Sequence, residues 1–163
     1  MTRPAAAIGS ILFFFLAPGT VAGLIPWWIT RWEFGAPGLA LSLAGGLIVV
    51  AGLVGLIACF TRFALEGLGT PAPVAPTKTL VVTGLYRRVR NPMYVAVTAI
   101  ILGQALMFVS LPLVAYGAVI WLAFQTFVVM YEEPTLRVTY GDPYTAYCAA
   151  VPRWIPRLRP WSP

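Results

Sequence analysis

The sequence predicts an all-α integral membrane protein with about four transmembrane helices and a cytoplasmic helical segment at the C-terminus. Of the 163 residues, 60% are hydrophobic and only 10% are charged. Such a chain has too little polar surface to enclose an apolar core in water. The charged residues are also segregated, because three long stretches contain no Asp, Glu, Lys or Arg, namely residues 4–30, 34–61 and 91–131.

The lengths of these stretches set the number of spans. A helix rises about 1.5 Å per residue, so roughly 20 apolar residues cross a hydrocarbon core of about 30 Å. The first two stretches fit one span each, and the third is long enough for two. Pro112 is its natural break, because proline lacks an amide donor and favours the start of a helix. We expect a helical hairpin over residues 92–109 and 113–131.

The first two spans carry prolines and glycines but no residues with identifiable chemistry. Pro18 and Pro26 predict kinks in the first span. Gly19 and Gly23 form a GxxxG pair, which permits close helix contact. We favour packing within the chain for this pair, and a homodimer is the other interpretation. The second span is rich in glycine and is interpreted in the same way.

Segments outside the spans differ in composition. Residues 67–76 contain too many prolines and glycines for a helix and predict a cytoplasmic loop, and residues 79–84 predict a short extended stretch that turns at Gly84. Polar and apolar residues mix over 132–150, which predicts a helix broken at Gly141. The basic, aromatic and proline-rich end of the chain suits a simple anchor at the membrane surface.

The positions of Lys and Arg predict the orientation. Of the 11 such residues, Arg31 alone falls in the loop between the first two spans, and the others fall at the opposite side. Because cytoplasmic loops carry the excess of Lys and Arg, both termini are expected to be cytoplasmic. The net charge of +6 then indicates attraction to anionic membrane lipids, and nucleic-acid binding is the weaker interpretation.

The residue inventory also limits the chemistry. The chain has no histidine, and its two cysteines, Cys59 and Cys148, fall in a span and in the tail. We therefore expect neither a metal site nor a disulfide. No glycine-rich turn of the GxGxxG type is present, so a soluble Rossmann-type cofactor site is not expected.

Two clusters of polar residues lie at the ends of the predicted hairpin. The first is residues 84–94, and the second begins with Glu132 and Glu133 and continues to Arg153. The hairpin brings both clusters to the same cytoplasmic end. A positive-inside anchor with acidic partners would explain either cluster alone. The combination favours a bound ligand, because paired carboxylates at the end of a membrane helix are costly.

Five sequence blocks carry a more specific signal. They are Gly84-Leu-Tyr86, Arg90-Asn-Pro-Met-Tyr94, Glu132-Glu-Pro-Thr-Leu136, Tyr140-Gly-Asp-Pro-Tyr-Thr-Ala-Tyr147 and Val151-Pro-Arg-Trp-Ile-Pro156. In order and spacing they resemble the isoprenylcysteine carboxyl methyltransferase and phospholipid methyltransferase family of membrane enzymes. The resemblance covers about residues 80–156. Asn91 and Ala96 stand where the family usually has histidine and glycine.

The resemblance implies a methyltransferase that uses S-adenosyl-L-methionine, held in a cytoplasmic pocket that caps the hairpin. It implies catalytic roles for Arg90 and Glu133. The residues implied in cofactor binding are Tyr86, Arg90, Asn91, Pro92, Tyr94, Glu132, Glu133, Tyr144 and Tyr147.

The implied substrate is a lipophilic small molecule or a lipidated acceptor that enters sideways from the lipid. An isoprenylcysteine-type carboxylate is favoured, with a phospholipid amine or a thiol as the alternative. On this interpretation residues 1–66 hold two N-terminal transmembrane helices, and residues 67–163 form the cofactor-binding core.

A hypothesis from another class is a small non-catalytic membrane subunit that packs against a partner. The GxxxG pair and the basic, tryptophan-bearing tail support it. Stable co-purification with a partner would favour the subunit, whereas cofactor binding would favour the enzyme.

Overall fold

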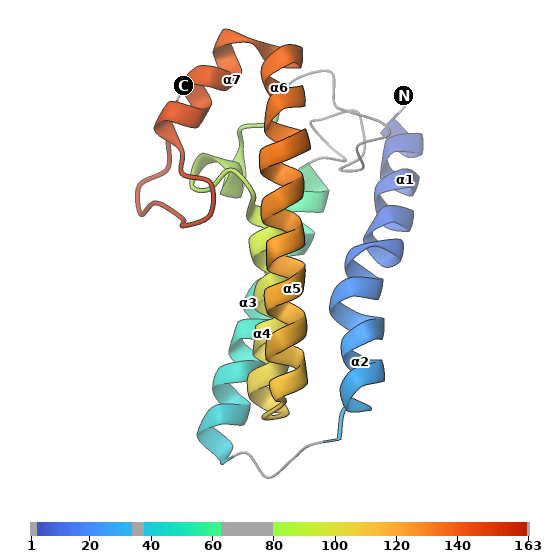
Figure 1. Ribbon diagram of the computed structural model, residues 1–163. Helices are drawn as coiled ribbons and strands as arrows, with labels where there is room; N and C mark the ends of the chain where they lie inside the picture. The colour runs from blue at the N-terminus through green and yellow to red at the C-terminus, as the bar shows by residue number, and fades with distance from the viewer. Residues whose placement is uncertain (1–2, 34–37, 63–79, 163) are drawn as a thin grey trace.

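The computed structural model describes residues 3–33, 38–62 and 80–162, and every regular element in these ranges is a helix (Figure 1). The elements in chain order are α1 (Arg3–Leu16), the π-helix η1 (Thr20–Leu24), α2 (Ile25–Thr30), α3 (Leu39–Arg62), the 3₁₀ turn η3 (Gly84–Arg87), α4 (Pro92–Met107), α5 (Leu111–Phe127), the π-helix η4 (Val128–Glu132), α6 (Glu133–Tyr140) and α7 (Asp142–Ala150). The predicted all-α membrane fold is confirmed. The loop predicted over residues 67–76 lies outside the described residues.

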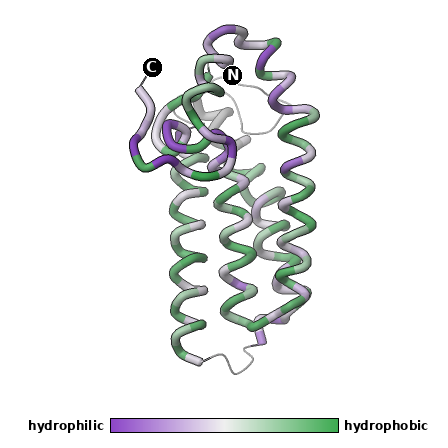
Figure 2. Tube along the Cα trace, turned by 60° about the vertical axis from the view of Figure 1, so that its left-hand side comes forward, coloured by the Kyte–Doolittle hydropathy of each residue, from purple (hydrophilic) through white to green (hydrophobic). Residues whose placement is uncertain are grey.

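The helices form an elongated bundle. In the described ranges, three helical runs are long and apolar enough to cross a membrane, namely Ile11–Thr30, Leu39–Arg62 and Leu111–Tyr140. The shorter apolar helix α4 packs between α3 and α5, an arrangement compatible with the four spans expected from the sequence. Figure 2 shows hydrophobic residues along these helices and hydrophilic residues concentrated where α6, α7 and the tail lie.

Small residues bring α3 and α4 into close contact. A Cβ atom added at Gly45 would lie 2.6 Å from the carbonyl oxygen of Gly103, which is too close for any side chain. A Cβ atom at Gly52 would lie 3.0 Å from the carbonyl oxygen of Ala96. The packing role predicted for the glycines of the second span is therefore confirmed at these two positions. The contact fixes α4, and with it the residues at the start of α4, against α3.

The hairpin between α4 and α5 turns where the sequence predicts. Ser110 caps α5, because its hydroxyl oxygen accepts the Leu113 N–H at 3.4 Å, and Pro112 stands in the first turn. Val109 adopts a positive φ of 49° and completes the reversal of the chain. Both clusters of polar residues consequently meet at the same end of the bundle.

Pro26 interrupts the first span by opening a π-helical turn. It has no N–H to offer the Ala22 carbonyl, and the Ile25 N–H donates to Thr20, five residues back. The carbonyls of Val21 and Ala22 are thereby released. Val21 accepts a hydrogen bond from the Tyr116 hydroxyl at 2.9 Å, and Ala22 accepts one from the buried Gln104 amide at 2.7 Å. These two bonds tie the first span to the hairpin.

The GxxxG pair of the first span is not used for packing within the described chain. A Cβ atom added at Gly23 would meet nothing within 4 Å, and one at Gly19 would meet only the Phe14 carbonyl and the Phe15 side chain of its own helix. Our favoured interpretation of this pair was therefore wrong. The first span is held through released carbonyls, so close backbone approach at these glycines is not needed.

The segment after α7 folds back onto the loop before α4. The backbone N–H groups of Arg157 and Trp161 donate to the carbonyls of Arg88 and Arg87 at 2.9 and 2.8 Å, and the Arg90 N–H donates to Pro152 at 2.9 Å. The tail is thus more than the simple anchor that was expected, because it is also part of the folded core around the polar cluster. The predicted turns at Gly84 and Gly141 are confirmed by their φ angles of 57° and 59°.

Candidate functional site

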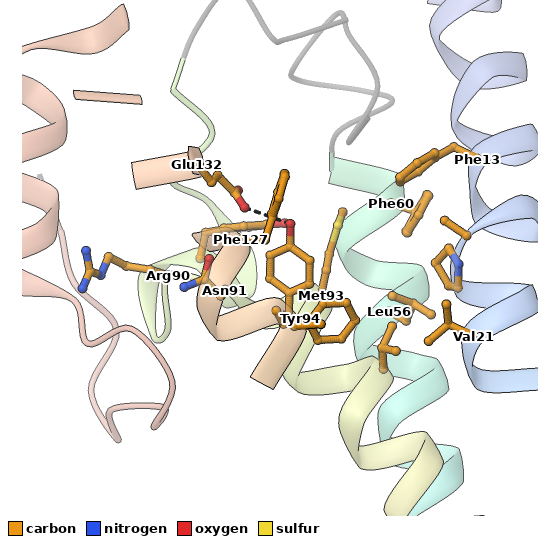
Figure 3. Close-up of a pocket in the computed structure, with 16 residues that line it drawn as sticks. Phe13, Val21, Leu56, Phe60, Arg90, Asn91, Met93, Tyr94, Phe127 and Glu132 are labelled. Atoms are coloured by element: carbon orange, nitrogen blue, oxygen red, sulfur yellow. Dashed lines mark hydrogen bonds between the residues drawn. The ribbon is translucent and has the colours of Figure 1, made fainter. Parts of the chain in front are cut away.

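A cavity of about 390 Å³ opens among the first span, α3, α4 and α5 at the end of the bundle that carries α6 and α7 (Figure 3). Most of its wall is apolar, and its polar groups come from the two predicted clusters. The lining residues are Phe13, Ala17, Pro18, Val21, Leu56, Phe60, Tyr86, Arg90, Asn91, Met93, Tyr94, Val97, Ala123, Phe124, Phe127 and Glu132. A molecule with an apolar chain and a polar head would match this division.

The polar end of the cavity is centred on Glu132 and Tyr94. The Tyr94 hydroxyl donates to Glu132 Oε2 at 2.8 Å, as the dashed line in Figure 3 shows. The Tyr94 ring also packs against Phe124, with centroids 4.6 Å apart. Among the residues that the structure describes, Glu132 has no ion-pair partner. A largely apolar cavity thus holds a carboxylate with no ion-pair partner in residues 3–33, 38–62 and 80–162, which favours a cationic or hydrogen-bond-donating ligand.

A second proline-induced π-turn ends at Glu132, directly before its neighbour Glu133. Pro134 has no N–H, and the Glu133 N–H donates to Val128, five residues back. The run from α5 to α6 therefore continues through Pro134 with one wide turn. Glu132 faces the cavity, whereas the buried Glu133 faces the tail. Single π-turns inside α-helices often mark functional sites.

Glu133 is held by two arginines from different segments. Arg153 of the tail binds it in a bidentate manner, with Nε–Oε1 and NH2–Oε2 distances of 2.7 and 2.9 Å. Arg90 lies 3.1 Å from the same Oε1 atom and also donates to Cys148 Sγ at 2.8 Å. The Arg90 guanidinium in Figure 3 points away from the Tyr94–Glu132 pair. The bridge Arg90–Glu133–Arg153 thus joins the start of α4, α6 and the tail.

Tyrosines form the support beneath this bridge. The Tyr147 hydroxyl donates to the Tyr86 carbonyl at 2.7 Å, and both side chains are buried, as is Tyr144. Burial raises the pKa of all three phenols, because the charged phenolate would lose its hydration. The three phenols therefore remain neutral near pH 7, and that of Tyr147 acts as a hydrogen-bond donor.

The structure brings the nine predicted binding residues together at one end of the bundle, in two layers. The first layer lines the cavity and consists of Tyr86, Arg90, Asn91, Tyr94 and Glu132. The second layer lies behind it and consists of Pro92, Glu133, Tyr144 and Tyr147. The individual catalytic and binding roles stay predictions.

The structure shows the surroundings of the two residues that depart from the family pattern, Asn91 and Ala96. Asn91 is buried, and its amide donates to the Arg153 carbonyl at 3.2 Å, so it helps to hold the tail in place. Ala96 lies in the α3–α4 contact, where its carbonyl oxygen faces Gly52 and its methyl group lies near Gly55, and it is not among the lining residues.

Sequence reasoning missed two groups of residues in this region. One is the apolar wall that the first span and α3 contribute, including Phe13, Leu56 and Phe60. No sequence signal distinguishes these from other apolar residues in a span. The other is the role of Arg153, which belongs to the second cluster but was not expected to bind Glu133; its bidentate contact completes the bridge. Its place in the fifth block was a usable signal.

Comparison with known protein families gives a match over a large part of the chain. Residues 38–143 match the family model described as phospholipid methyltransferase, which covers more than half of the chain. The match runs from the start of α3 into α7, includes the first cluster and the start of the second with Glu132 and Glu133, and ends before Tyr144. No curated protein and no solved structure matches the chain.

Proposed function

The chain belongs to the phospholipid methyltransferase family, and from this premise we propose that it transfers a methyl group from S-adenosyl-L-methionine to a lipophilic acceptor. Membership makes it a membrane methyltransferase of lipid-type substrates. The observation that carries the finer proposal is the Tyr94–Glu132 pair at the polar end of a cavity that is otherwise apolar. The donor and the head of the acceptor would meet there.

The residues present fit the methyl donor. S-adenosyl-L-methionine carries a sulfonium, an ammonium and ribose hydroxyls, all of which suit the carboxylate of Glu132. Its carboxylate requires a hydrogen-bond donor, and Arg90 Nε is buried without a partner in the described part of the chain. An orphaned buried donor of this kind indicates a missing acceptor. When bound, the donor supplies an electrophilic methyl group.

The protein's task in such a transfer is alignment and exclusion of water. Displacement at a sulfonium needs no metal, and its rate depends on the geometry and dryness of the site. We propose that Glu132 and Tyr94 orient the donor and that Arg90 contacts an anionic group of donor or acceptor. Glu133 holds the Arg90 guanidinium and thus acts as its positioning partner.

An isoprenylcysteine-type carboxylate is the acceptor that the five motif blocks favour. The apolar wall suits an isoprenoid chain, and Arg90 provides the nearby cation that a carboxylate head requires. Ala123 lines the cavity and is exposed on the outside of α5, which supports entry of the chain sideways from the lipid.

A phospholipid amine is the second candidate, with a thiol as a further alternative. The specific observation in favour of the amine is that Glu132 faces the cavity and forms no ion pair with any residue that the structure describes, whereas the Arg90 guanidinium is paired with Glu133. A protonated amine would be attracted to the unpaired carboxylate, which could also accept its proton before transfer.

Two measurements test the proposal. Calorimetry of the folded protein in detergent should detect binding of S-adenosylhomocysteine, and Glu133→Ala and Tyr94→Ala should weaken it. Incubation with membrane lipids and methyl-labelled donor should yield a labelled lipid. Alkali releases label from a methyl ester but not from a methylated amine, so this step distinguishes the two acceptors. Absence of both binding and transfer in a folded sample would favour the non-catalytic subunit.

A further inference from the structure

The tail returns to the side of the membrane helices after α7. The Trp154 indole N–H donates to Gln125 Oε1 on α5 at 2.6 Å, and the Trp154 ring lies 6.1 Å from the Trp121 ring on the same helix. Figure 1 shows the segment after α7 turning back along the bundle. Trp154 is therefore attached to α5 well before the point where this helical run reaches Glu132.

This attachment sets the depth of the loop that follows. Gln125 precedes Glu132 by seven residues, which corresponds to about 10 Å along a helix. Both Trp121 and Gln125 fall within the charge-free stretch 91–131, which crosses the hydrocarbon. Residues 154–158 must then lie near the boundary between hydrocarbon and headgroups.

The side chains of the loop suit this depth. Ile155 is 78% exposed and Leu158 is 92% exposed, although both are large and apolar. In water such exposure would forgo about 1.5–3 kcal/mol for each side chain. Next to Trp154 these side chains extend the apolar surface of α5 outward, so lipid is the environment that covers both surfaces.

The backbone polar groups of the loop also have hydrogen-bond partners within the protein, as a poorly hydrated setting requires. The Arg157 N–H donates to the Arg88 carbonyl at 2.9 Å, and the Leu158 carbonyl accepts a hydrogen bond from the Arg88 guanidinium at 2.5 Å. Irregular backbone at membrane depth requires such internal partners. Arg159 follows Leu158 and is exposed, in reach of anionic phosphates.

We propose that residues 154–158 form an interfacial loop that inserts into the leaflet on the α6–α7 side. Ile155 and Leu158 enter the acyl region, and Arg159 contacts anionic headgroups. The occupant of this surface is thus the lipid of the bilayer that the helices span. Because Arg153 directly precedes the loop, insertion would also hold Arg153 against Glu133. This proposal does not depend on which acceptor is methylated.

Spin-label depth measurements test the loop in the full-length protein. Labels are attached to Ile155→Cys and Leu158→Cys in a Cys59→Ala and Cys148→Ala background, with Val138→Cys as the matched control. Val138 is 89% exposed, like Leu158, but lies on α6 beyond Glu133. The protein is placed in bilayers of equal amounts of phosphatidylcholine and phosphatidylserine. Collisions with dissolved oxygen and with a water-soluble nickel complex are then compared.

We expect the ratio of the oxygen collision rate to the nickel collision rate to be high at residues 155 and 158 and low at residue 138. Oxygen should dominate at 155 and 158, and the nickel complex should dominate at 138. Nickel access at 155 and 158 equal to that at 138, in samples of unchanged helicity, would overturn insertion and leave the surface for a protein partner. Replacing phosphatidylserine by phosphatidylcholine should make the label at 158 shallower. Unchanged depth would overturn the role of anionic headgroups.

Discussion

Glu132 and Glu133 are adjacent in the sequence, yet their carboxylates lie in different surroundings. Glu133 forms ion pairs with two arginines, whereas Glu132 accepts a hydrogen bond from the Tyr94 hydroxyl, has no ion-pair partner in the described part of the chain and faces the cavity. The division follows from their place as successive residues of one helical run, because neighbouring side chains point about 100° apart around a helix axis. At the scale of single residues, one carboxylate is available for a ligand and the other organises the arginines around it.

The role of the Tyr94 hydroxyl can be isolated with Tyr94→Phe. The ring contact with Phe124 remains, but Glu132 loses its hydrogen bond. A hydrogen bond to a charged group contributes about 1.5–3 kcal/mol, so S-adenosylhomocysteine binding should weaken by about three- to twelvefold if half of that contribution is lost from the site. Calorimetry measures the change. Tyr131→Phe, at an exposed phenol, is the control and should leave affinity unchanged. Equal affinities in both variants would contradict the assignment.

Arg153 is expected to act as a positioning residue through Glu133. Arg153→Ala removes the bidentate pair and leaves Glu133 with Arg90 alone. Hydrogen bonds to charged groups contribute about 1.5–3 kcal/mol, and partial exposure of Arg153 places the loss at the low end.

Steady-state methyl transfer should show a lower kcat with a smaller change in KM for the donor, and Arg153→Lys should restore part of the rate. Arg31→Ala, at the opposite end of the bundle, should behave like the unaltered protein. A loss of stability in Arg153→Ala without any change in kcat would show a purely structural role.

At the scale of elements, the helices are held together by two different kinds of contact. Small residues permit backbone contact between α3 and α4, and polar side chains of α4 and α5 bind carbonyls that Pro26 releases in the first span. Neither kind of contact depends on the burial of apolar surface. Such burial stabilises helix association little in lipid, because the lipid tails are also apolar.

Two adjacent glycines of α3 test the close backbone contact between α3 and α4. Gly45→Ala places a methyl group 2.6 Å from the Gly103 carbonyl oxygen, so α3 and α4 must separate. Overpacking of this kind costs about 1–3 kcal/mol. Gly46→Ala meets nothing within 4 Å and should be neutral or stabilising by up to about 1 kcal/mol through helix propensity. Unfolding in mixed micelles of increasing denaturing detergent gives both free energies. A similar change in the two variants would contradict the close-contact interpretation.

Element boundaries were predictable where one residue carries a strong local preference. Pro112 marked the hairpin, and Gly141 marked the break between α6 and α7. The π-turns were not predicted, because a proline such as Pro26 or Pro134 indicates an interruption of the helix but does not specify a hydrogen bond to the residue five positions back. The folded tail was missed for a similar reason, since its bonds join residues about 70 positions apart.

At the scale of the whole molecule, the charged ends of the chain converge. Figure 1 shows the first helix beginning and the tail ending at the same end of the bundle, where α6 and α7 also lie. Arg31 lies at the opposite end, at the end of α2. The positive-inside pattern and the four-helix path are therefore compatible, and the cytoplasmic location of both termini stays a prediction.

Membrane topology can be measured with single reporters. Fluorescent-protein fusions at the N- or C-terminus should fluoresce in the cytoplasm. An alkaline phosphatase fusion truncated after Glu33 should be active outside it, because the loop carries only one arginine. An active phosphatase at the C-terminus would reverse the assignment or change the number of crossings.

How much of the site could be predicted depended on residue type. Charged and aromatic groups in motif blocks, such as Tyr94 and Glu132, were identified before their neighbours were known, because such residues are rare at the end of a span. The apolar wall was not, since Phe13 and Leu56 have no feature that separates them from lipid-facing residues. The shape of the cavity therefore comes from the packing of the first span, which local sequence does not encode.

The carbonyls released by Pro26 have a consequence for biogenesis. A growing chain delivers its first span to the membrane before the partners of these carbonyls exist, since Ala22 precedes Gln104 by 82 residues and Val21 precedes Tyr116 by 95. Until the hairpin is synthesised, the two carbonyls need water or the polar interior of the insertion machinery. The cavity wall that this span provides is thus completed only when α5 arrives, late in translation.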